Sequence, residues 1–368
     1  MSYPTLRLHP RKEESVLRFH PWIFSGAIAS FSAPVEDGDL VSVVDSKGRP
    51  LGTGHFGGGS IAVRLLSFDA EEVIDRAFYK RRLEAALRLR LSCDLVRPVG
   101  SSDSPNTTYR LVHGEGDSLP GLIIDIYDRT AVVQAHSLGM HQARQTIAEV
   151  LWEVFAEAGD PVLPLEGVYY KSETTLPTRD MRELASDGFL IGHTEAAPIY
   201  ENGVRFTPDW LKGQKTGFFI DQRDNRALVA HYAKGRTVLN AFCYTGGFSI
   251  YALHAGAKRV DSLDSSAKAM YLTEQHVVLN FGADCPRHHS VTEDAFDYLE
   301  RMPEGEYDLI ILDPPAFAKH RKVLRNALIG YRKINSIAFK KVAPGGIVFT
   351  FSCSQAVSKE EFRLAVFT

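Results

Sequence analysis

The sequence predicts a multidomain α/β protein with an N-terminal β-barrel, a central α+β domain and a C-terminal doubly wound α/β domain. Its 368 residues exceed what one ordinary hydrophobic core holds. Short apolar runs broken by glycine and proline fill the first part, whereas the last part alternates amphipathic helices with continuous β-branched runs. We predict domain boundaries at 1–72, 73–205 and 206–368.

The first segment, residues 1–72, consists of short apolar runs that are typical of strands. They read WIFSGAI, GDLVSVVD, PLGTGHF and SIAVRLL. Two of these runs flank Asp45-Ser46-Lys47-Gly48, a polar turn sequence that predicts a β-hairpin. Several short strands joined in this way favour a small β-barrel.

The middle segment begins with a helical pattern over Glu71–Leu91 that connects it to the barrel. A polar stretch, PVGSSDSPNTTYR, reads as a loop. Strand, turn and strand follow in GLIIDIYDRTAVVQAH, then an amphipathic helix over Met140–Ala158 and further strands around EGVYYKSE and GVRFTP. This order predicts a compact α+β unit, and it contains no obvious nucleophile or metal-ligand set.

From about Gly217 onward, amphipathic helices alternate with buried strands. The strand sequences are RTVLNAF, KRVDSLD, HHSVT, YDLIILD and IVFTFSC. Strands that are apolar on both faces and separated by helices predict a parallel sheet covered on both sides. In such a sheet, ligands bind at the carboxyl edge of the strands.

Composition and charge limit the classes of function. The net charge is −3, but Arg76–Arg90 and Lys319–Lys333 are both locally basic, and the second segment contains no acidic residue. A local basic surface suits a partner that carries phosphates, although for Arg76–Arg90 an ordinary solvated helix face is the favoured interpretation.

No apolar stretch is long enough for a membrane span, and the N-terminus has no apolar signal region. The four cysteines show no CxxC spacing, so we expect a reduced, cytoplasmic protein without a metal site.

The segment VLNAFCYTGGFS predicts a cofactor loop between a strand and a helix. We expect side chains at Gly246 or Gly247 to block a ligand that approaches the backbone there. Asp264 ends the next strand, 18 residues after Gly246, where a carboxylate can accept hydrogen bonds from a ribose. Both nicotinamide and S-adenosylmethionine enzymes use this arrangement, but the missing G-x-G-x-x-G pattern favours the second. Asp294 is a weaker candidate, as an acceptor for an adenine amino group.

The segment LDPPAF predicts a second functional loop. Two prolines end the strand abruptly because they have no N–H to donate to a sheet, which leaves Asp313 at the carboxyl edge. An acid before Pro-Pro and an aromatic residue resembles motif IV of class I methyltransferases, where acid and backbone hold a target nitrogen. Phe317 is placed to stack on a base.

Cys353 closes the neighbouring strand, and we expect it at the same edge as Asp313. A cysteine thiolate can add to C6 of cytosine and make C5 nucleophilic toward a sulfonium methyl group. Such a thiol needs nearby positive charge, for which Lys319 and Arg321 are candidates. The alternative is a small buried core residue. Cys243 and Cys285 are interpreted as core or surface thiols.

In combination, these motifs are similar to those of the RNA 5-methylcytosine methyltransferases related to the 23S ribosomal RNA large-subunit methyltransferase I. HPWIFSGAI resembles the family's PUA domain, and RLVHGEGDSLPGLIIDIYD resembles the opening of its central domain. KTGFFIDQRDNR, VLNAFCYTGGFS, LDPPAF and FSCS resemble its motifs X, I, IV and VI. The order and number of these motifs are specific to the family.

The resemblance implies a PUA module that docks ribosomal RNA, a Rossmann-like class I methyltransferase domain, and S-adenosylmethionine as cofactor. It implies Cys353 and Asp313 as catalytic residues. The cofactor-binding residues that follow from it are Asn240, Phe242, Tyr244, Thr245, Gly246, Gly247, Asp264, Ser265, Asp294 and Gln222. The substrate-binding residues are Arg223, Pro314, Phe317, Lys319 and Arg321.

The chain departs from the family pattern at two places. Many relatives carry a second cysteine in motif IV, where this chain has Pro315-Ala316, so the residue that takes the C5 proton has no assignment. The chain also stops at Thr368, where the family continues into a final pair of strands, so we expect the C-terminal strands to be missing.

Three other functions stay open. They are methylation of a guanine nitrogen, which needs no cysteine, noncatalytic RNA binding, and nicotinamide-dependent dehydrogenation. A homodimer is also left open as the state of assembly.

Overall fold

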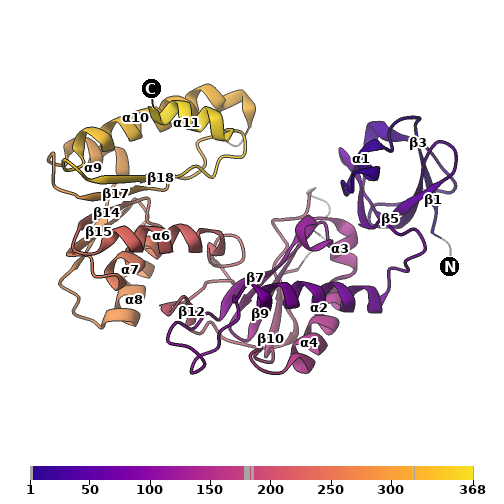
Figure 1. The fold of residues 1–368 in the computed structure, drawn as a ribbon, viewed down its shortest axis with the longest axis horizontal. Coiled ribbons are helices and arrows are strands. Elements are labelled where there is room, and N and C mark those ends of the chain that lie inside the picture. The colour runs from indigo at the N-terminus through magenta and orange to yellow at the C-terminus, as the bar shows by residue number, and fades with distance from the viewer. Residues whose placement is uncertain (1–2, 178–182, 184–185, 319, 368) are drawn as a thin grey trace. The chain divides into compact units, whose positions relative to one another are not determined.

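The structure is a computed structural model that describes residues 3–177, 183, 186–318 and 320–367 (Figure 1). Its contacts divide the chain into two compact units. The first unit contains Met1–Gly203 and Thr207–Ile220, and the second contains Val204–Phe206 and Asp221–Thr368. This division differs from the sequence-based boundary at 205/206, because residues 207–220 contact the first unit.

The N-terminal part of the first unit is a six-stranded sheet in the order β2-β6-β5-β4-β1-β3. Its strands are β1 (Thr5–Leu8), β2 (Trp22–Phe24), β3 (Ile28–Phe31), β4 (Leu40–Val44), β5 (Pro50–Phe56) and β6 (Ile61–Ser67), with a short helix α1 (Glu14–Leu17). Alternate residues such as Val41 and Val43 on β4 are buried and form the core, as the period of a strand requires. The predicted hairpin joins β4 to β5, and Asp45 Oδ1 accepts hydrogen bonds from the N–H groups of Lys47 and Arg49 at 2.9 and 2.8 Å.

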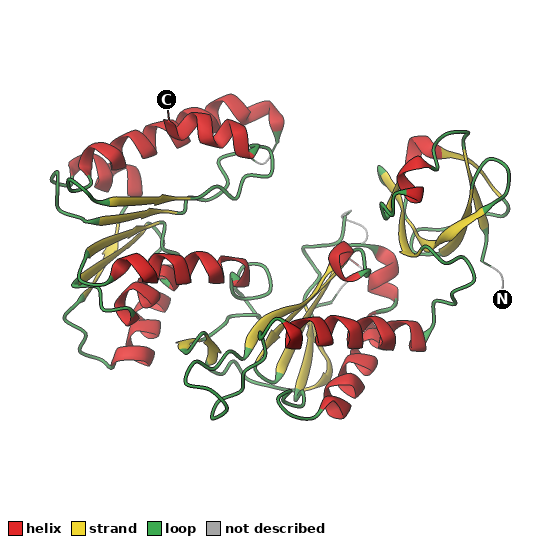
Figure 2. Cartoon of the chain, in the orientation of Figure 1, coloured by secondary structure: helices red, strands yellow, loops and turns green. Residues whose placement is uncertain are grey.

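The rest of the first unit is an α+β domain, as expected. Its five-stranded sheet has the order β11-β10-β9-β8-β7. Figure 2 shows the strands of this domain in yellow with red helices beside them. The strands are β7 (Thr108–His113), β8 (Leu122–Tyr127), β9 (Thr130–Ala135), β10 (Gly167–Tyr170) and β11 (Gly188–Gly192), followed by the short β12 (Ile199–Glu201). The helices are α2 (Arg76–Ser92), α3 (Leu138–Gln142) and α4 (Arg144–Ala158). The apolar faces of α2 and α4 join the strands in one core cluster.

Residues 207–220 belong to the first unit, and hydrogen bonds to Lys171 and Asp125 tie them to it. Nζ of Lys171, on the segment after β10, donates to the carbonyl of Trp210 at 2.5 Å. Oγ1 of Thr216 donates to Oδ2 of Asp125 on β8 at 2.6 Å. These contacts fix the segment that leads into Gln222 and Arg223 of the second unit.

The sheet of the second unit consists of five parallel strands in the order β16-β15-β14-β17-β18. They are β14 (Thr237–Ala241), β15 (Arg259–Asp264), β16 (His288–Thr292), β17 (Leu309–Leu312) and β18 (Ile347–Thr350), and β13 (Val204–Phe206) also belongs to this unit. The chain moves from β14 outward to β16 and then crosses back to β17 on the other side of β14. The pair β14 and β17 is therefore the topological switch point, where α/β sheets of this kind bind ligands.

Helices cover both faces of this sheet (Figure 1). On one face lie α6 (Arg223–Ala233), α7 (Gly247–His254) and α8 (Ala267–Phe281), and on the other lie α9 (Ala295–Arg301), α10 (Leu324–Lys341) and α11 (Lys359–Phe367). Leu239, Leu263 and Ile310 of the strands are fully buried against Leu299 of α9 and Ile334 of α10. The predicted doubly wound α/β domain is confirmed.

Candidate active site at the switch point of the sheet

Two predicted loops meet at the carboxyl ends of β14 and β17. These strands pair in parallel with Ala241 opposite Leu312, and the N–H of Asp313 donates to the carbonyl of Ala241 at 3.5 Å. The loop after Ala241 carries the predicted cofactor residues, and the loop after Leu312 carries the DPP sequence. The topology thus brings together two segments that are 71 residues apart between Phe242 and Asp313.

The cofactor loop has an unusual backbone. Phe242, Tyr244 and Gly246 have φ values of 59°, 49° and 77°, in the left-handed region that glycine tolerates and that other residues enter at a cost of about 1–3 kcal/mol. One neighbouring helix, α8, holds this conformation: Oγ1 of Thr273 donates to the Tyr244 carbonyl at 3.0 Å, and Nδ1 of His276 is 2.8 Å from the Thr245 carbonyl. Strained backbone held this firmly is typical of a ligand site.

Asp264 lies at the end of β15 and faces this loop. Its Oδ2 accepts the N–H of Tyr244 at 3.0 Å, and its Oδ1 accepts the N–H of Ser266 at 2.9 Å. A carboxylate has about four acceptor positions, so each oxygen keeps capacity for a further donor. Asp264 is half-buried and the adjacent Ser265 is exposed. The pair therefore borders the loop where the sequence analysis expected a ribose.

Protein packing disfavours a side chain at Gly246 and leaves little room for one at Gly247. A Cβ at Gly246 would lie 2.5 Å from Cγ2 of Thr273, and a Cβ at Gly247 would lie 3.1 Å from Cδ of Arg226 on α6. We expected a ligand to be what excludes side chains here. The structure shows that the loop and the start of α7 approach α8 and α6 closely at these glycines, and the ligand contact stays a prediction.

Asn240 is buried on β14, and Phe242 is half-buried directly after this strand. Asn240 is fully buried, and its Nδ2 donates to Oγ of Ser249 on α7 at 2.9 Å. Its Oδ1 is buried and has no hydrogen-bond partner within the described part of the chain. The ring of Phe242 packs on the core beside Phe296, with ring centroids 6.5 Å apart.

Asp294 is exposed and forms the N-cap of α9. Its Oδ1 accepts the N–H groups of Phe296 and Asp297 at 2.8 and 3.2 Å. The residue therefore has a structural role that explains its presence without any ligand. Both of these N–H groups bond to Oδ1, and the contact expected between Asp294 and an adenine amino group stays a prediction.

The motif X segment contacts the DPP loop within the second unit. Nε2 of Gln222 donates to Oδ2 of Asp313 at 3.2 Å, and Oε1 of Gln222 accepts from Nδ2 of Asn225 at 2.6 Å. The side chain of Arg223 is 16% exposed, and its Nη1 is buried without a hydrogen-bond partner among the described residues. A buried, unpaired guanidinium nitrogen next to Gln222 indicates a place that an acceptor can fill.

Cys353 is exposed, and its Sγ donates to the carbonyl of Pro314 at 3.7 Å. It follows β18, which pairs with β17 so that Leu312 lies opposite Thr350. The predicted thiol therefore stands at the DPP corner. Cys243 is the opposite case, because burial raises the pKa of its thiol well above the ordinary range.

Phe317, Arg321 and Lys319 complete the predicted substrate set. The ring of Phe317 packs against Tyr331 of α10 with centroids 4.7 Å apart, so it is partly buried in protein contacts. Arg321 is exposed and forms an ion pair with Glu361 at 3.5 Å. Lys319 lies outside the described residues.

Several side chains that shape the site escaped the sequence analysis. Thr273 and His276 hold the cofactor loop from one face of α8, and Asn225 orients Gln222. Tyr331, fully buried on α10, contacts both serines beside Cys353. The spacing of three residues between Thr273 and His276, both polar on an otherwise apolar helix face, is the one signal that the sequence contains.

The two basic segments differ in the structure. On α2, Arg76 and Lys80 are paired with Glu149, Glu153 and Glu157 of α4 at 2.7–3.2 Å. Other basic residues of α2 pair with Glu72, Glu84 and Asp117. The interpretation of this segment as a solvated helix face is consistent with these pairs.

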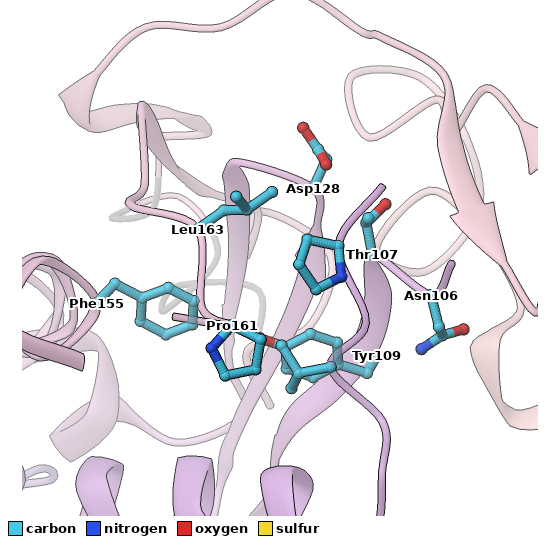
Figure 3. A pocket seen from close by; sticks show the side chains of 9 residues that line it. Asn106, Thr107, Tyr109, Asp128, Phe155, Pro161 and Leu163 are labelled. Atoms are coloured by element: carbon cyan, nitrogen blue, oxygen red, sulfur yellow. The ribbon is translucent and has the colours of Figure 1, made fainter. Parts of the chain in front are cut away.

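Other features of the described chain lie apart from these loops. A pocket in the central domain contains none of the predicted site residues and is lined in part by Tyr109, Asp128, Phe155 and Pro161 (Figure 3). Among the described residues, no helix is long and apolar enough to cross a membrane, and no group of three histidine, cysteine or acidic residues could hold a metal ion.

Comparison with known proteins gives matches over the whole chain. A model described as an S-adenosylmethionine-dependent methyltransferase matches residues 178–364, and a PUA-like domain model matches residues 6–68. The ribosomal RNA large subunit methyltransferase I of Shewanella denitrificans is 39% identical over 98% of this chain and 88% of its own length. That of Alteromonas mediterranea is 38% identical over 98% and 87%.

Two solved structures share the fold. A protein named as an S-adenosylmethionine-dependent methyltransferase of Streptococcus mutans superposes with a TM-score of 0.78 and 22% identity, covering 100% of this chain and 89% of that one. A second, named as a methyltransferase and solved with SAH, gives a TM-score of 0.79 and 23% identity over 100% and 90%. Identities this low establish the shared fold alone.

Proposed function

We propose that this chain forms 5-methylcytosine in large-subunit ribosomal RNA. The chain belongs to the ribosomal RNA large subunit methyltransferase I family of S-adenosylmethionine-dependent methyltransferases, and this membership is the premise of the proposal. Family membership supports the reaction class and the cofactor. Cytosine C5 is the proposed methyl acceptor. A ribosomal RNA substrate also supports the cytoplasmic location expected from the sequence.

The residues at the switch point fit the cofactor. S-adenosylmethionine, when bound, supplies a methyl group on a positively charged sulfur. Asp264 offers acceptor capacity for ribose hydroxyls beside the Phe242–Gly247 loop, and Asp294 offers its second oxygen for an amino group. The unsatisfied Oδ1 of Asn240, buried under the loop, is a further polar atom that a ligand or water can satisfy.

The observation that carries the proposal is the exposed thiol of Cys353 beside the Pro314 carbonyl. As a thiolate, Sγ forms a bond to C6 of the cytosine, and the electron pair of the C5–C6 double bond moves onto C5. C5 then forms a bond to the methyl carbon as the bond between that carbon and the sulfonium sulfur breaks, and the electron pair of the broken bond stays on the sulfur. Loss of the C5 proton restores the double bond as the bond between Sγ and C6 breaks, so Cys353 is regenerated.

Asp313 and Gln222 are proposed to orient the base. Asp313 accepts a hydrogen bond from Nε2 of Gln222, which fixes the carboxylate. A carboxylate has about four acceptor positions, so Asp313 can also accept from the exocyclic amino group of cytosine, as the resemblance to motif IV implies. The unpaired Nη1 of Arg223 is a donor for the base or its phosphate.

RNA binding is proposed to involve both ends of the chain. The base must leave its stack to reach Cys353, so the target is a single-stranded or flipped cytidine. Pro314, Phe317, Lys319 and Arg321 belong to the DPP loop or follow it, and they are the proposed contacts. The PUA-like domain at residues 6–68 is proposed to dock the surrounding RNA.

The test is nucleoside mass spectrometry on large-subunit ribosomal RNA from a strain that lacks the gene, incubated with purified protein and cofactor. We expect the wild type and Cys93→Ala to form 5-methylcytosine, because Cys93 is an exposed thiol at the end of α2 in the first unit. Cys353→Ala should lower the rate by at least about 1,000-fold with unchanged cofactor affinity, because it removes the nucleophile. Full activity of Cys353→Ala, or a methylated guanine as product, contradicts the proposal.

A further inference from the structure

We propose that Tyr331 is a positioning residue that holds the thiol of Cys353 at the DPP corner, an inference that rests on the proposed role of Cys353. Tyr331 lies on α10 and is fully buried. Its phenol oxygen lies within hydrogen-bond distance of the side chains on both sides of Cys353. The resemblance that identified Cys353 contained no information on Tyr331.

The phenol oxygen closes a ring of hydrogen bonds around Cys353. Oγ of Ser352 donates to Oη of Tyr331 at 2.9 Å, and Oη of Tyr331 lies 2.8 Å from Oγ of Ser354. The N–H of Ser354 donates to Oγ of Ser352 at 3.3 Å. The residues before and after the cysteine are therefore both tied to one buried oxygen.

This ring determines where the thiol points. Ser354 is 5% exposed and turned inward to α10, whereas Cys353 between the two serines is exposed. With both neighbours anchored to the same atom, rotation of the segment about its own axis is blocked. The side chain of Cys353 is thus directed out of the α10 layer and toward the Pro314 carbonyl, 3.7 Å from Sγ.

The same centre also holds the DPP loop. The N–H of Ala318, four residues after Pro314, donates to Oγ of Ser354 at 3.3 Å. The Tyr331 ring packs on Phe317 with centroids 4.7 Å apart and on Phe362 at 5.1 Å. Tyr331 therefore ties the nucleophile segment to the base-binding segment, and their relative position depends on its hydroxyl group.

The cofactor loop depends on other contacts. It is held by Asp264, Thr273 and His276, and among the described residues none of these bonds involves Tyr331. Loss of the Tyr331 hydroxyl should therefore affect the chemical step and leave cofactor binding unchanged. A misplacement of about 1 Å at a reacting atom costs about 100-fold in rate.

The test compares Tyr331→Phe with Tyr298→Phe. The phenylalanine keeps the ring packing and removes only the oxygen. Tyr298 is a matched control because it is also a buried tyrosine of the second unit whose Oη lies 2.5 Å from another side-chain oxygen, Oη of Tyr307. Tyr307 precedes β17 and therefore lies at the amino edge of the sheet, opposite to Cys353. The double variant Ser352→Ala/Ser354→Ala removes the other half of the ring and leaves Tyr331 in place.

We expect Tyr331→Phe to lower kcat by about 10- to 100-fold, with the cofactor Kd and the RNA KM within about twofold of wild type. Backbone amide exchange at Ala318 and Ser354, followed by mass spectrometry, should accelerate at least about threefold because both N–H groups bond within the ring. The serine double variant should behave in the same way, and Tyr298→Phe should change none of these quantities.

Unchanged exchange at Ala318 and Ser354 in both variants overturns the positioning role, whatever the activity. Faster exchange with unchanged kcat also overturns it, if Cys353→Ala is inactive. If Cys353→Ala is fully active, the proposed function fails. Faster exchange at the two amides would then still support the link between the two segments, so the two failures are distinguishable.

Discussion

Single carboxylates at the carboxyl edge of the sheet hold the backbone of the loops, as Asp264 shows. Asp264 accepts one backbone N–H on each oxygen, at 3.0 and 2.9 Å, and so fixes the turn that contains Tyr244. A hydrogen bond to a charged group contributes about 1.5–3 kcal/mol. The same two oxygens are the acceptors that we propose for the hydroxyl groups of the cofactor ribose.

We predict that Asp264→Ala raises the cofactor Kd by about 10- to 100-fold, because one or two charged hydrogen bonds are removed. Calorimetric titration with S-adenosylmethionine measures it. Asp308→Ala is the control, since Oδ2 of Asp308 accepts the N–H of Thr237 at 2.8 Å at the opposite edge of the same sheet. An equal change of Kd in both variants would show that general destabilisation is responsible.

The sequence predicts which residues lie at this edge where a motif ends a strand. Asp264, Asp313 and Cys353 are such residues. Thr273 and Arg226 could not be predicted. Their contacts to Gly246 and Gly247 arise between helices that are distant in sequence. Packing of this kind has no local sequence pattern, so the reason for the two glycines became visible only in the fold.

At the scale of elements, Asp294 caps α9 and is also a proposed cofactor contact. We predict that Asp294→Ala lowers the free energy of unfolding by about 1 kcal/mol, because both N–H groups that Oδ1 accepts lose their partner. Asp294→Asn should keep the cap, since asparagine is an equally good N-cap. Urea titration measures the first effect.

The same two variants test the cofactor role of Asp294. An amide oxygen can also accept from an adenine amino group, so Asp294→Asn should leave the cofactor Kd within about threefold of wild type. Asp294→Ala should weaken binding more than this. If both variants bind the cofactor like wild type, Asp294 is a cap alone.

The basic segments Arg76–Arg90 and Lys319–Lys333 differ in how their charges are paired. In the second segment Arg321 and Lys333 pair with Glu361 and Glu300, but the other lysine and arginine side chains that the structure describes there do not. Arg76 and Lys80 of α2 are neutralised by glutamates of α4. Lys322, in the 3-10 turn Arg321–Val323, and Arg325 at the start of α10 are exposed, and within the described residues neither has an ion-pair partner. Charges that face solvent near the DPP loop are the better candidates for phosphate contacts.

We predict that Lys322→Ala/Arg325→Ala weakens RNA binding several-fold and reduces the slope of log K against log salt by about 0.7 for each phosphate that the variant no longer neutralises. Arg76→Ala/Lys80→Ala should leave both quantities unchanged, because these side chains are already paired. Filter binding at several salt concentrations measures the slope. Equal slopes for both double variants would remove α10 from the RNA-binding surface.

For the molecule as a whole, the buried His55 and the half-buried His288 make stability depend on pH. Burial, with a contribution from Arg64, lowers the pKa of His55 to about 4, and burial lowers the pKa of His288 to about 4 as well. In the unfolded chain both titrate near pH 6.5. The unfolded state therefore binds more protons between these values, so stability falls as the pH drops from about 6.5 to 4.

We predict that His55→Gln flattens this dependence, because the buried imidazole accounts for up to about 3 kcal/mol of it. Urea midpoints at about pH 7.5, 6.0 and 5.0 measure the slope across the window in which the unfolded chain takes up protons. His254→Gln is the control, since His254 is exposed at the end of α7. The explanation is wrong if both variants keep the slope of the wild type.

Local patterns in the sequence were sufficient for the class of each domain and for the edge of the sheet at which the two loops lie. Strand periodicity, helix amphipathicity and the Pro-Pro stop are properties of short segments, and they carried the prediction of β14, β17 and the doubly wound sheet. The motifs in order were enough to identify the family.

How these loops are held could be learned only from the packed fold. The bond from Gln222 to Asp313, the seating of the cofactor loop on α8 and the ring around Cys353 each join residues from different elements. The assignment of residues 207–220 to the first unit also depends on contacts between elements, because Lys171 and Asp125 hold that segment. Contacts of this type depend on the distances between packed elements, which no local pattern of residues specifies.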